Sequence, residues 1–312
     1  LIVYKNNQFR YGDWYYGPQK WSLFSAQVQY HSDLVLFDKL NFLSGFQRYT
    51  ESRFDRNLHK PVRNGREEDL SVFSVNLDLA KNINAQNEFF YGIESYLNTV
   101  NSTGTATQLL TGETEVIPSR YPGDSDYGSV AAYFSYKFNL ANRLILQAGI
   151  RGTRTWLNGE FNPEHYHFPF AGFDMKNSAL NGNIGLVWHP TTEWQVNLSS
   201  STGFRSPNLD DVAKVFDSEP GNVMVPNPGL KPEYARNFEI GLIRSFSGKA
   251  VFEVNGFYTR LKDAMVRRDF TLNGQDSLMY DGTMSKVEAL VNADAAVIYG
   301  GSLVLEYLFT NF

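Results

Sequence analysis

Short runs of alternating apolar and polar residues recur along most of the chain. In residues 73–79, Phe, Val, Leu and Leu occupy every second position, and Ser, Asn and Asp lie between them. Alternation with a period of two places the two sets on opposite faces of a β-strand. Eleven strands are predicted in this way, at about residues 24–30, 39–49, 73–79, 88–97, 132–138, 143–151, 184–188, 193–205, 234–246, 250–258 and 297–309. The pattern therefore predicts an all-β protein.

The connections between these strands alternate in length. Those after the first, third, fifth, seventh and ninth strands are short, and those after the even-numbered strands are long and rich in Pro, Arg and Tyr. One long connection, predicted at residues 51–69, is charged and holds Arg53, Arg56, Arg63 and Arg66. Short turns at one rim and long loops at the other are what a transmembrane β-barrel requires. A soluble propeller or sandwich has no reason to keep this rhythm.

The two strand faces differ in a way that also favours a membrane barrel. One face is almost free of charge, whereas the other carries Glu, Lys, Arg, Asn and Gln at mid-strand positions. Such polar residues are costly in a packed core without partners, but they suit a wide, wet or plugged lumen. Aromatic residues near the strand ends are typical of a girdle at the membrane interface. The predicted girdle residues are Trp21, Tyr49, Tyr133, Trp156, Trp188, Trp194 and Tyr258.

Composition excludes several other classes of protein. The chain has 312 residues, a net charge of −5 and no cysteine, and its mean hydropathy is −0.34. No apolar run is long enough for a membrane helix, but a barrel strand presents only every second residue to lipid. The lack of Cys excludes a disulfide framework and a thiolate site. The mild acidity gives no reason to expect nucleic acid as a partner.

The most specific stretch covers residues 193–242. A strand ends in Phe204-Arg205-Ser206-Pro207-Asn208, and five prolines mark residues 206–232 as a loop. The loop ends in Asn227-Pro228-Gly229-Leu230-Lys231-Pro232-Glu233, and the next strand contains Asn237-Phe238-Glu239-Ile240-Gly241-Leu242. These three linked motifs resemble, in order and spacing, the barrel of TonB-dependent outer-membrane receptors, with the closest likeness to receptors of the Bacteroidetes type.

The resemblance implies a fold larger than this chain. We predict about eleven strands of a 22-stranded, antiparallel, up-and-down transmembrane barrel, so that residues 1–312 are a partial barrel domain. The plug domain, the TonB-contacting segment and the terminal strands of the family have no counterpart in the sequence, which also has no signal peptide. We therefore expect the chain to be an internal piece of a longer protein.

The resemblance also implies a function. Receptors of this family bind a scarce, bulky ligand at the outer rim and import it when TonB pulls on the plug. The expected partners are TonB through that plug, outer-membrane lipid and lipopolysaccharide, and an imported small molecule, which we predict to be a ferric siderophore or a similar iron complex. Cobalamin and glycan receptors are alternatives within the family. A soluble all-β carbohydrate-binding or hydrolase module is the alternative outside it.

Candidate ligand contacts lie in the predicted outer loops and at one strand end. They are Arg120, Tyr121, His165, Tyr166, His167 and Arg205. The motif residues are predicted to be structural, because they fix how a loop leaves and re-enters the wall. This structural set comprises Phe204, Arg205, Pro207, Asn208, Asn227, Pro228, Leu230, Lys231, Pro232, Glu233, Glu239 and Gly241.

Two short patterns carry little catalytic meaning. The pair His165-x-His167 could bind a metal, but two histidines beside Tyr and Phe on a loop are more often surface residues. Asp210-Asp211 could be an acid pair, but beside Asn208 these residues are typical of the cap of a short helix, predicted at residues 210–216. The sequence suggests no Ser/His/Asp set, and no glycine-rich phosphate loop follows a strand. We expect no enzyme activity, resident metal or cofactor.

Overall fold

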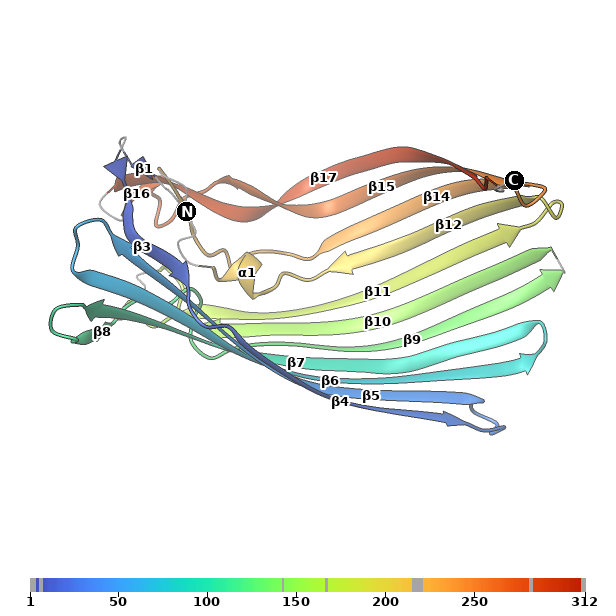
Figure 1. The fold of residues 1–312 in the computed structure, drawn as a ribbon, viewed down its shortest axis with the longest axis horizontal. Helices are drawn as coiled ribbons and strands as arrows, with labels where there is room; N and C mark the ends of the chain where they lie inside the picture. Colours follow the sequence, from blue (N-terminus) through green and yellow to red (C-terminus); the bar gives the residue numbers. More distant parts are fainter. Residues whose placement is uncertain are drawn as a thin grey trace.

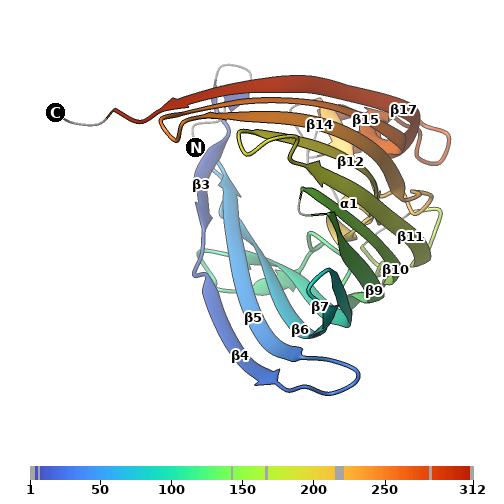
Figure 2. The ribbon, with the colours of Figure 1, turned by 90° about the vertical axis from the view of Figure 1, so that its right-hand side faces the viewer.

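The computed structural model describes residues 4–5, 8–141, 143–165, 168–214, 221–280 and 283–309. Fifteen strands of this part form one sheet, which curls into an open arc with the short helix α1 on its concave side (Figures 1 and 2). The elements are β1 Tyr4–Lys5, β2 Gln8–Phe9, β3 Tyr11–Tyr16, β4 Lys20–His31, β5 Lys39–Asn57, β6 Val62–Asn84, β7 Asn87–Gln108, β8 Thr114–Val116, β9 Ser125–Ala141, β10 Leu144–Glu160, β11 Gly172–Trp188, β12 Trp194–Arg205, α1 Leu209–Val212, β13 Asn222–Met224, β14 Glu233–Phe246, β15 Ala250–Asp269, β16 Ser277–Tyr280 and β17 Thr283–Tyr307.

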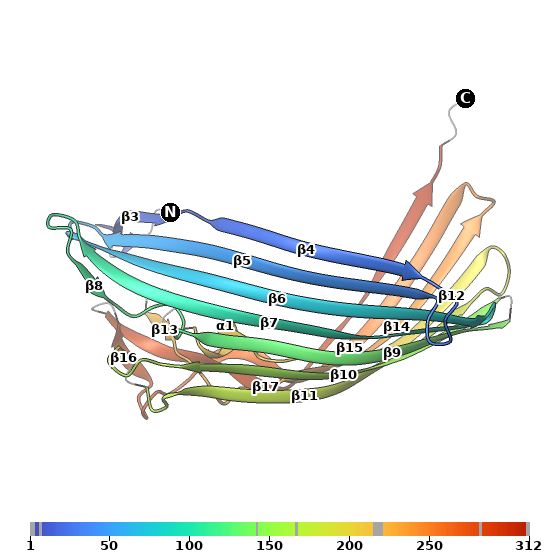
Figure 3. The same ribbon diagram turned by 90° about the horizontal axis from the view of Figure 1, so that it is seen from below.

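The long strands follow one another in an antiparallel meander. The order across the sheet is β17-β15-β14-β12-β11-β10-β9-β7-β6-β5, and β4 pairs with β5 at the edge. Figure 3 shows the long strands β4, β5, β6, β7, β9, β10 and β11 running side by side. Eleven strands have 12 residues or more in the described part of the chain. The predicted all-β barrel wall of about eleven strands is confirmed.

The apolar strand positions form a continuous outward band. The register aligns Ile240 of β14 with Leu198 of β12 and with Gly256 of β15, so that they share one face. Phe238 and Ile240 are 56% and 57% exposed. Exposed apolar side chains over a whole sheet face require lipid, because water would make such a surface aggregate. Among the described residues, no helix is long and apolar enough to cross a membrane.

The concave face is polar and cross-linked. An ion pair of 2.8 Å joins Arg151 to Glu94, and Tyr133 donates a hydrogen bond to Asp78. Three predicted girdle residues, Trp21, Tyr49 and Tyr133, lie on this face rather than on the lipid face, which corrects the prediction. The physical reason is that successive residues of a strand point to opposite faces. Ala132 and Phe134 point outward, so Tyr133 between them points inward.

The predicted charged loop at residues 51–69 is wrong. The antiparallel ladder of β5 and β6 continues from Glu51↔Glu68 to Asp55↔Asn64, and the true loop comprises only residues 58–61. Arg66 and Asp55 form an ion pair of 2.9 Å across it. Both faces of this extension lie beyond the apolar band, so no apolar alternation marks it as a strand. The same reason explains why β3, β8 and the outer end of β7 fall in segments predicted to be irregular.

The longest loop folds into the arc and supplies five of the thirteen buried apolar residues in the described part of the chain. Residues 206–232 carry Val212, Ala213 and Leu230 against Leu157 of β10 and Phe173 of β11. A second cluster joins Val223 and Val225 to Val287 and Ala289 of β17, next to the parallel pairing of β13 with β17. The wall and this inward loop together set the position of the site described below.

Candidate functional site

The corner where β12 ends is built around Arg205. Its Nη2 donates to both carboxylate oxygens of Asp211 at 2.7 Å, and its Nη1 donates to Glu233 at 3.2 Å. Glu233 opens β14, so one guanidinium joins the two ends of the loop. Phe204, the preceding motif residue, packs its ring 5.6 Å from that of Tyr234 on β14.

A capping box starts α1 directly after this corner. The side chain of Asn208 accepts a hydrogen bond from the Asp211 backbone at 3.0 Å, and Asp211 accepts one from the Asn208 backbone at 3.1 Å. Pro207 is fully buried beside it. The helix is Leu209–Val212, shorter than the predicted 210–216, of which residues 215 and 216 lie outside the described part.

The second and third motifs return the loop to the wall. Asn227 donates to the carbonyl of Leu290 at 2.7 Å, and the backbone of Lys231 donates to Asn292 at 2.8 Å, both across to β17. Pro228 and Pro232 flank the buried Leu230. On β14, Glu239 accepts from Asn237 at 2.6 Å. A Cβ on Gly241 would lie 2.6 Å from Oδ1 of Asn255, so a larger residue here would displace the Asn255 side chain.

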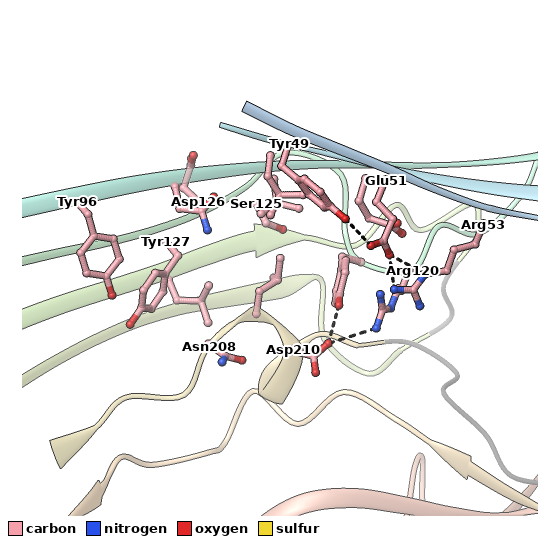
Figure 4. Close-up of a pocket in the computed structure, with 17 residues that line it drawn as sticks. Tyr49, Glu51, Arg53, Tyr96, Arg120, Ser125, Asp126, Tyr127, Asn208 and Asp210 are labelled. Carbon is pink, nitrogen blue, oxygen red and sulfur yellow. Dashed lines mark hydrogen bonds and ion pairs between the residues drawn. The ribbon is translucent and has the colours of Figure 1, made fainter. Parts of the chain in front are cut away.

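A pocket of about 410 Å³ opens on the concave side near the long-loop rim (Figure 4). The wall supplies residues of β5, β6, β7 and β9, and the loops supply Arg120, Tyr121 and α1. Its titratable or charged lining residues are Tyr49, Glu51, Arg53, Glu68, Tyr96, Arg120, Tyr121, Asp126, Tyr127 and Asp210. Arg48 and Asp69, next to the pocket residues Tyr49 and Glu68 in the sequence, lie on the outer face and form an exposed ion pair of 2.6 Å. The pocket therefore lies beyond the end of the apolar band.

Two groups of contacts order the pocket wall. Glu51 accepts hydrogen bonds from Tyr49 at 3.0 Å and from Nε of Arg53 at 2.8 Å. Across the pocket, Asp210 accepts from the hydroxyl of Tyr121 at 2.5 Å and lies 3.7 Å from Arg120. The second group ties the loop before β9 to α1. Burial raises the pKa of Tyr121, and the hydrogen bond to Asp210 raises it further, so Tyr121 remains a neutral donor.

Glu68 is the exception in this network. It is 3% exposed, and neither of its carboxylate oxygens has a hydrogen-bond partner among the described residues. Burial raises the pKa of this carboxyl, and the nearby guanidinium groups of Arg120 and Arg53 oppose the rise only in part. A buried acceptor without a donor costs stability, so Glu68 is a residue that the packing of the wall does not explain.

Replacing Glu68 by Gln is expected to stabilise the protein at neutral pH. The folded-state pKa lies above the unfolded value, so the folded protein binds this proton more tightly, and Glu68 costs stability once the pH rises above about 4.3. Urea unfolding should show Glu68→Gln gaining about 1–3 kcal/mol at pH 7.5 and much less at pH 4. Glu67→Gln, on the exposed neighbouring residue, is the matched control. A gain of equal size at both pH values would contradict the assignment.

The structure brings together only some of the candidate ligand contacts. Arg120 and Tyr121 both line the pocket, with the Arg120 guanidinium 5.0 Å above the Tyr121 ring. His165 and Arg205 are not among its lining residues, and Arg205 is held by the corner carboxylates. Tyr166 and His167 lie outside the described residues. Among the described residues, no group of three His, Cys, Asp or Glu could hold a metal ion.

The sequence predictions missed the wall side of the pocket. Tyr49, Glu51 and Glu68 lie on inward positions of β5 and β6, within or next to the segment predicted as a loop. The parity of the two strands places them inward, because residues 49, 51 and 53 continue the inward positions 45 and 47, but no apolar alternation in the sequence shows that the strands extend this far.

A curled antiparallel sheet with a lipid-facing band, a polar concave face and long loops at one rim defines the wall of an outer-membrane β-barrel. The family model "TonB dependent receptor-like, beta-barrel" matches residues 2–312. The chain belongs to this family and is therefore part of a receptor barrel of the bacterial outer membrane, not of an enzyme. A soluble carbohydrate-binding or hydrolase module, kept as an alternative above, is thereby overturned.

Three known proteins illustrate the likeness. The chain is 31% identical over 140 residues to hemoglobin-haptoglobin utilization protein B of Neisseria meningitidis, covering 42% of the chain and 17% of that protein. It is 35% identical over 92 residues to the iron-regulated outer membrane virulence protein of Vibrio cholerae, covering 29% and 14%. The structure of the copper transporter OprC matches with a TM-score of 0.75 at 14% identity, covering 94% of the chain and 44% of that chain. The chain thus spans less than half the length of each of these proteins.

Proposed function

We propose that the chain forms about half of the wall of an outer-membrane receptor that takes up an iron-bearing ligand with energy from TonB. In this proposal further strands close the barrel and a plug occupies its lumen, as the family resemblance implies. The single observation that supports ligand capture by this part of the wall is the pocket, which lies beyond the lipid band on the concave side. It is lined by tyrosines and by charges of both signs.

A ferric siderophore or similar chelate is the ligand that we favour. Among the described residues that line the pocket, none is His, Cys or Met, so the pocket offers no soft or imidazole ligand for haem iron. Aromatic and charged side chains suit a complex whose iron remains inside its own chelator. Haem is the second candidate, because one relative of 31% identity is a hemoglobin-haptoglobin utilization protein.

Uptake of labelled iron tests the proposal. Cells whose only outer-membrane iron receptor is the full-length protein should accumulate iron-55 from ferric trihydroxamate or tricatecholate complexes, and the same cells without TonB should not. Accumulation from haem alone would favour the second candidate. Accumulation of neither, with uptake of cobalamin or a glycan instead, would overturn iron as the cargo.

The motif likeness to receptors of the Bacteroidetes type stays a prediction. The named relatives come from Neisseria meningitidis and Vibrio cholerae, and they align over less than half of the chain. Lipopolysaccharide likewise stays a proposed partner, whose place would be the outward face at the level of Arg48.

A further inference from the structure

The buried carboxylate of Glu68 differs from the other acids of the pocket. Glu51 is neutralised by Arg53 and accepts from Tyr49, and Asp210 is held by Tyr121, Arg120 and Lys214. Glu68 alone among these three accepts no hydrogen bond from the described residues, although it is 97% covered and lines the pocket. The wall of the pocket therefore contains a desolvated acceptor that has no donor among the described residues.

Together, the charged side chains of the pocket give it a net negative charge. Three carboxylates face it (Glu51, Glu68 and Asp210), against two guanidinium groups (Arg53 and Arg120), whereas the parity of β9 places the Asp126 carboxylate on the outward face with Phe134. Arg53 is committed to Glu51. Arg120 lies against the Tyr121 ring and near Asp210. An incoming cation would thus be favoured over an incoming anion of the same size.

Aromatic rings complete the surroundings. Tyr49, Tyr96, Tyr121 and Tyr127 line the same pocket, and the rings of Tyr96 and Tyr127 lie 5.6 Å apart. Ring faces attract ammonium and guanidinium ions, most strongly where water is excluded. A carboxylate among tyrosine rings is a combination that recognises organic cations.

We propose that this pocket binds a primary ammonium or guanidinium group carried by the imported molecule, with the Glu68 carboxylate as its hydrogen-bond acceptor. The inference rests on the proposed receptor function, because it assigns the cation to the cargo. If the inference holds, the imported molecule is a chelate or another compound that carries an accessible basic group.

Binding of small probes to the full-length receptor in detergent tests the proposal. Saturation-transfer NMR would compare n-butylammonium with n-butanol and n-butyrate, which have the same four-carbon skeleton but no charge or the opposite charge. Butylammonium should bind saturably with a Kd on the order of 1 mM and at least about tenfold more tightly than either analogue. Glu68→Gln should weaken its binding about tenfold or more, and the control Glu67→Gln should leave it unchanged.

Several results would overturn the proposal. Equal binding of butylammonium and butanol by the wild-type receptor would do so without any variant. Preference for butyrate would assign the pocket to an anion held by Arg120 and Arg53. If butylammonium does not bind and Glu68→Gln is less stable than wild type, the partner of the Glu68 carboxylate is a basic side chain of the full-length receptor itself.

Failure of the receptor function is distinguishable from failure of this inference. If iron uptake is absent while butylammonium binding depends on Glu68, the iron cargo is wrong and the cation preference holds. If uptake is present and butylammonium does not bind, the receptor function holds and the inference falls.

Discussion

Replacing Ile240 by Lys is expected to lower the free energy of unfolding of the membrane-inserted receptor by about 2–4 kcal/mol. Ile240 lies midway between Arg236 and Arg244, which share its outward face on β14. It is 57% exposed to the surrounding medium, which at this depth is hydrocarbon. A lysine there would have to place its charge in lipid or distort the bilayer to reach water.

The measurement is urea unfolding of the receptor in lipid vesicles, with migration on a gel before and after boiling as the check of folding. Two variants separate charge from shape. Ile240→Leu keeps the site apolar and should change stability by less than about 1 kcal/mol. Ser199→Lys adds the same charge on the concave face opposite Glu239, where an ion pair is available. Equal effects of lysine on the two faces would contradict the assignment of the lipid side.

Arg205→Ala is expected to cost about 2–3 kcal/mol and to free the loop of residues 206–232. The substitution leaves Asp211 and Glu233 without their shared counter-ion, and their side chains are only 12% and 18% exposed. Removing one partner from a largely buried ion pair is far more costly than the pair is stabilising. Because the Arg205 side chain itself is 48% exposed, the expected loss lies below that of a fully buried network.

Limited proteolysis of the folded receptor should show new cleavage within residues 206–232 of Arg205→Ala, and urea unfolding should show the loss of stability. Arg205→Lys is the matched variant. It keeps the charge but has a single nitrogen, so it cannot donate to Asp211 and to Glu233 in the way that Nη2 and Nη1 of Arg205 do, and an intermediate loss is expected. A lysine variant as stable as wild type would show that charge alone holds the corner.

The sequence predicts the membrane part of the wall because lipid imposes a rule on every second residue. Phe73, Val75, Leu77 and Leu79 must all be apolar where they face hydrocarbon, and this regularity identifies β6 without any alignment. This alternation ends where the strands leave the apolar band. From Glu51 to Asp55 the ladder of hydrogen bonds continues, but both faces are wet, so the sequence carries no periodic signal and resembles a loop.

Residues of the candidate site can be predicted from the sequence only where they are neighbours in one segment. Arg120 and Tyr121 are adjacent in the sequence and were identified together as loop residues. Glu68 lies between Glu67 and Asp69 in an acidic run, and its burial depends on wall residues and on loops that approach from far along the chain. The residues next to Glu68 in the sequence indicate neither that its carboxylate is buried nor that it lacks a hydrogen-bond donor.

The parallel pairing of β13 with β17 has a consequence for how the protein is assembled. Val223 finds its partner only at Val287, and both are fully covered in the finished wall. If strands are inserted in chain order, the loop of residues 206–232 must wait, with its valines uncovered, until β15 and β17 have entered the membrane. A stall in biogenesis after β14 would therefore leave Val223 and Val225 uncovered at the long-loop rim of an unfinished wall.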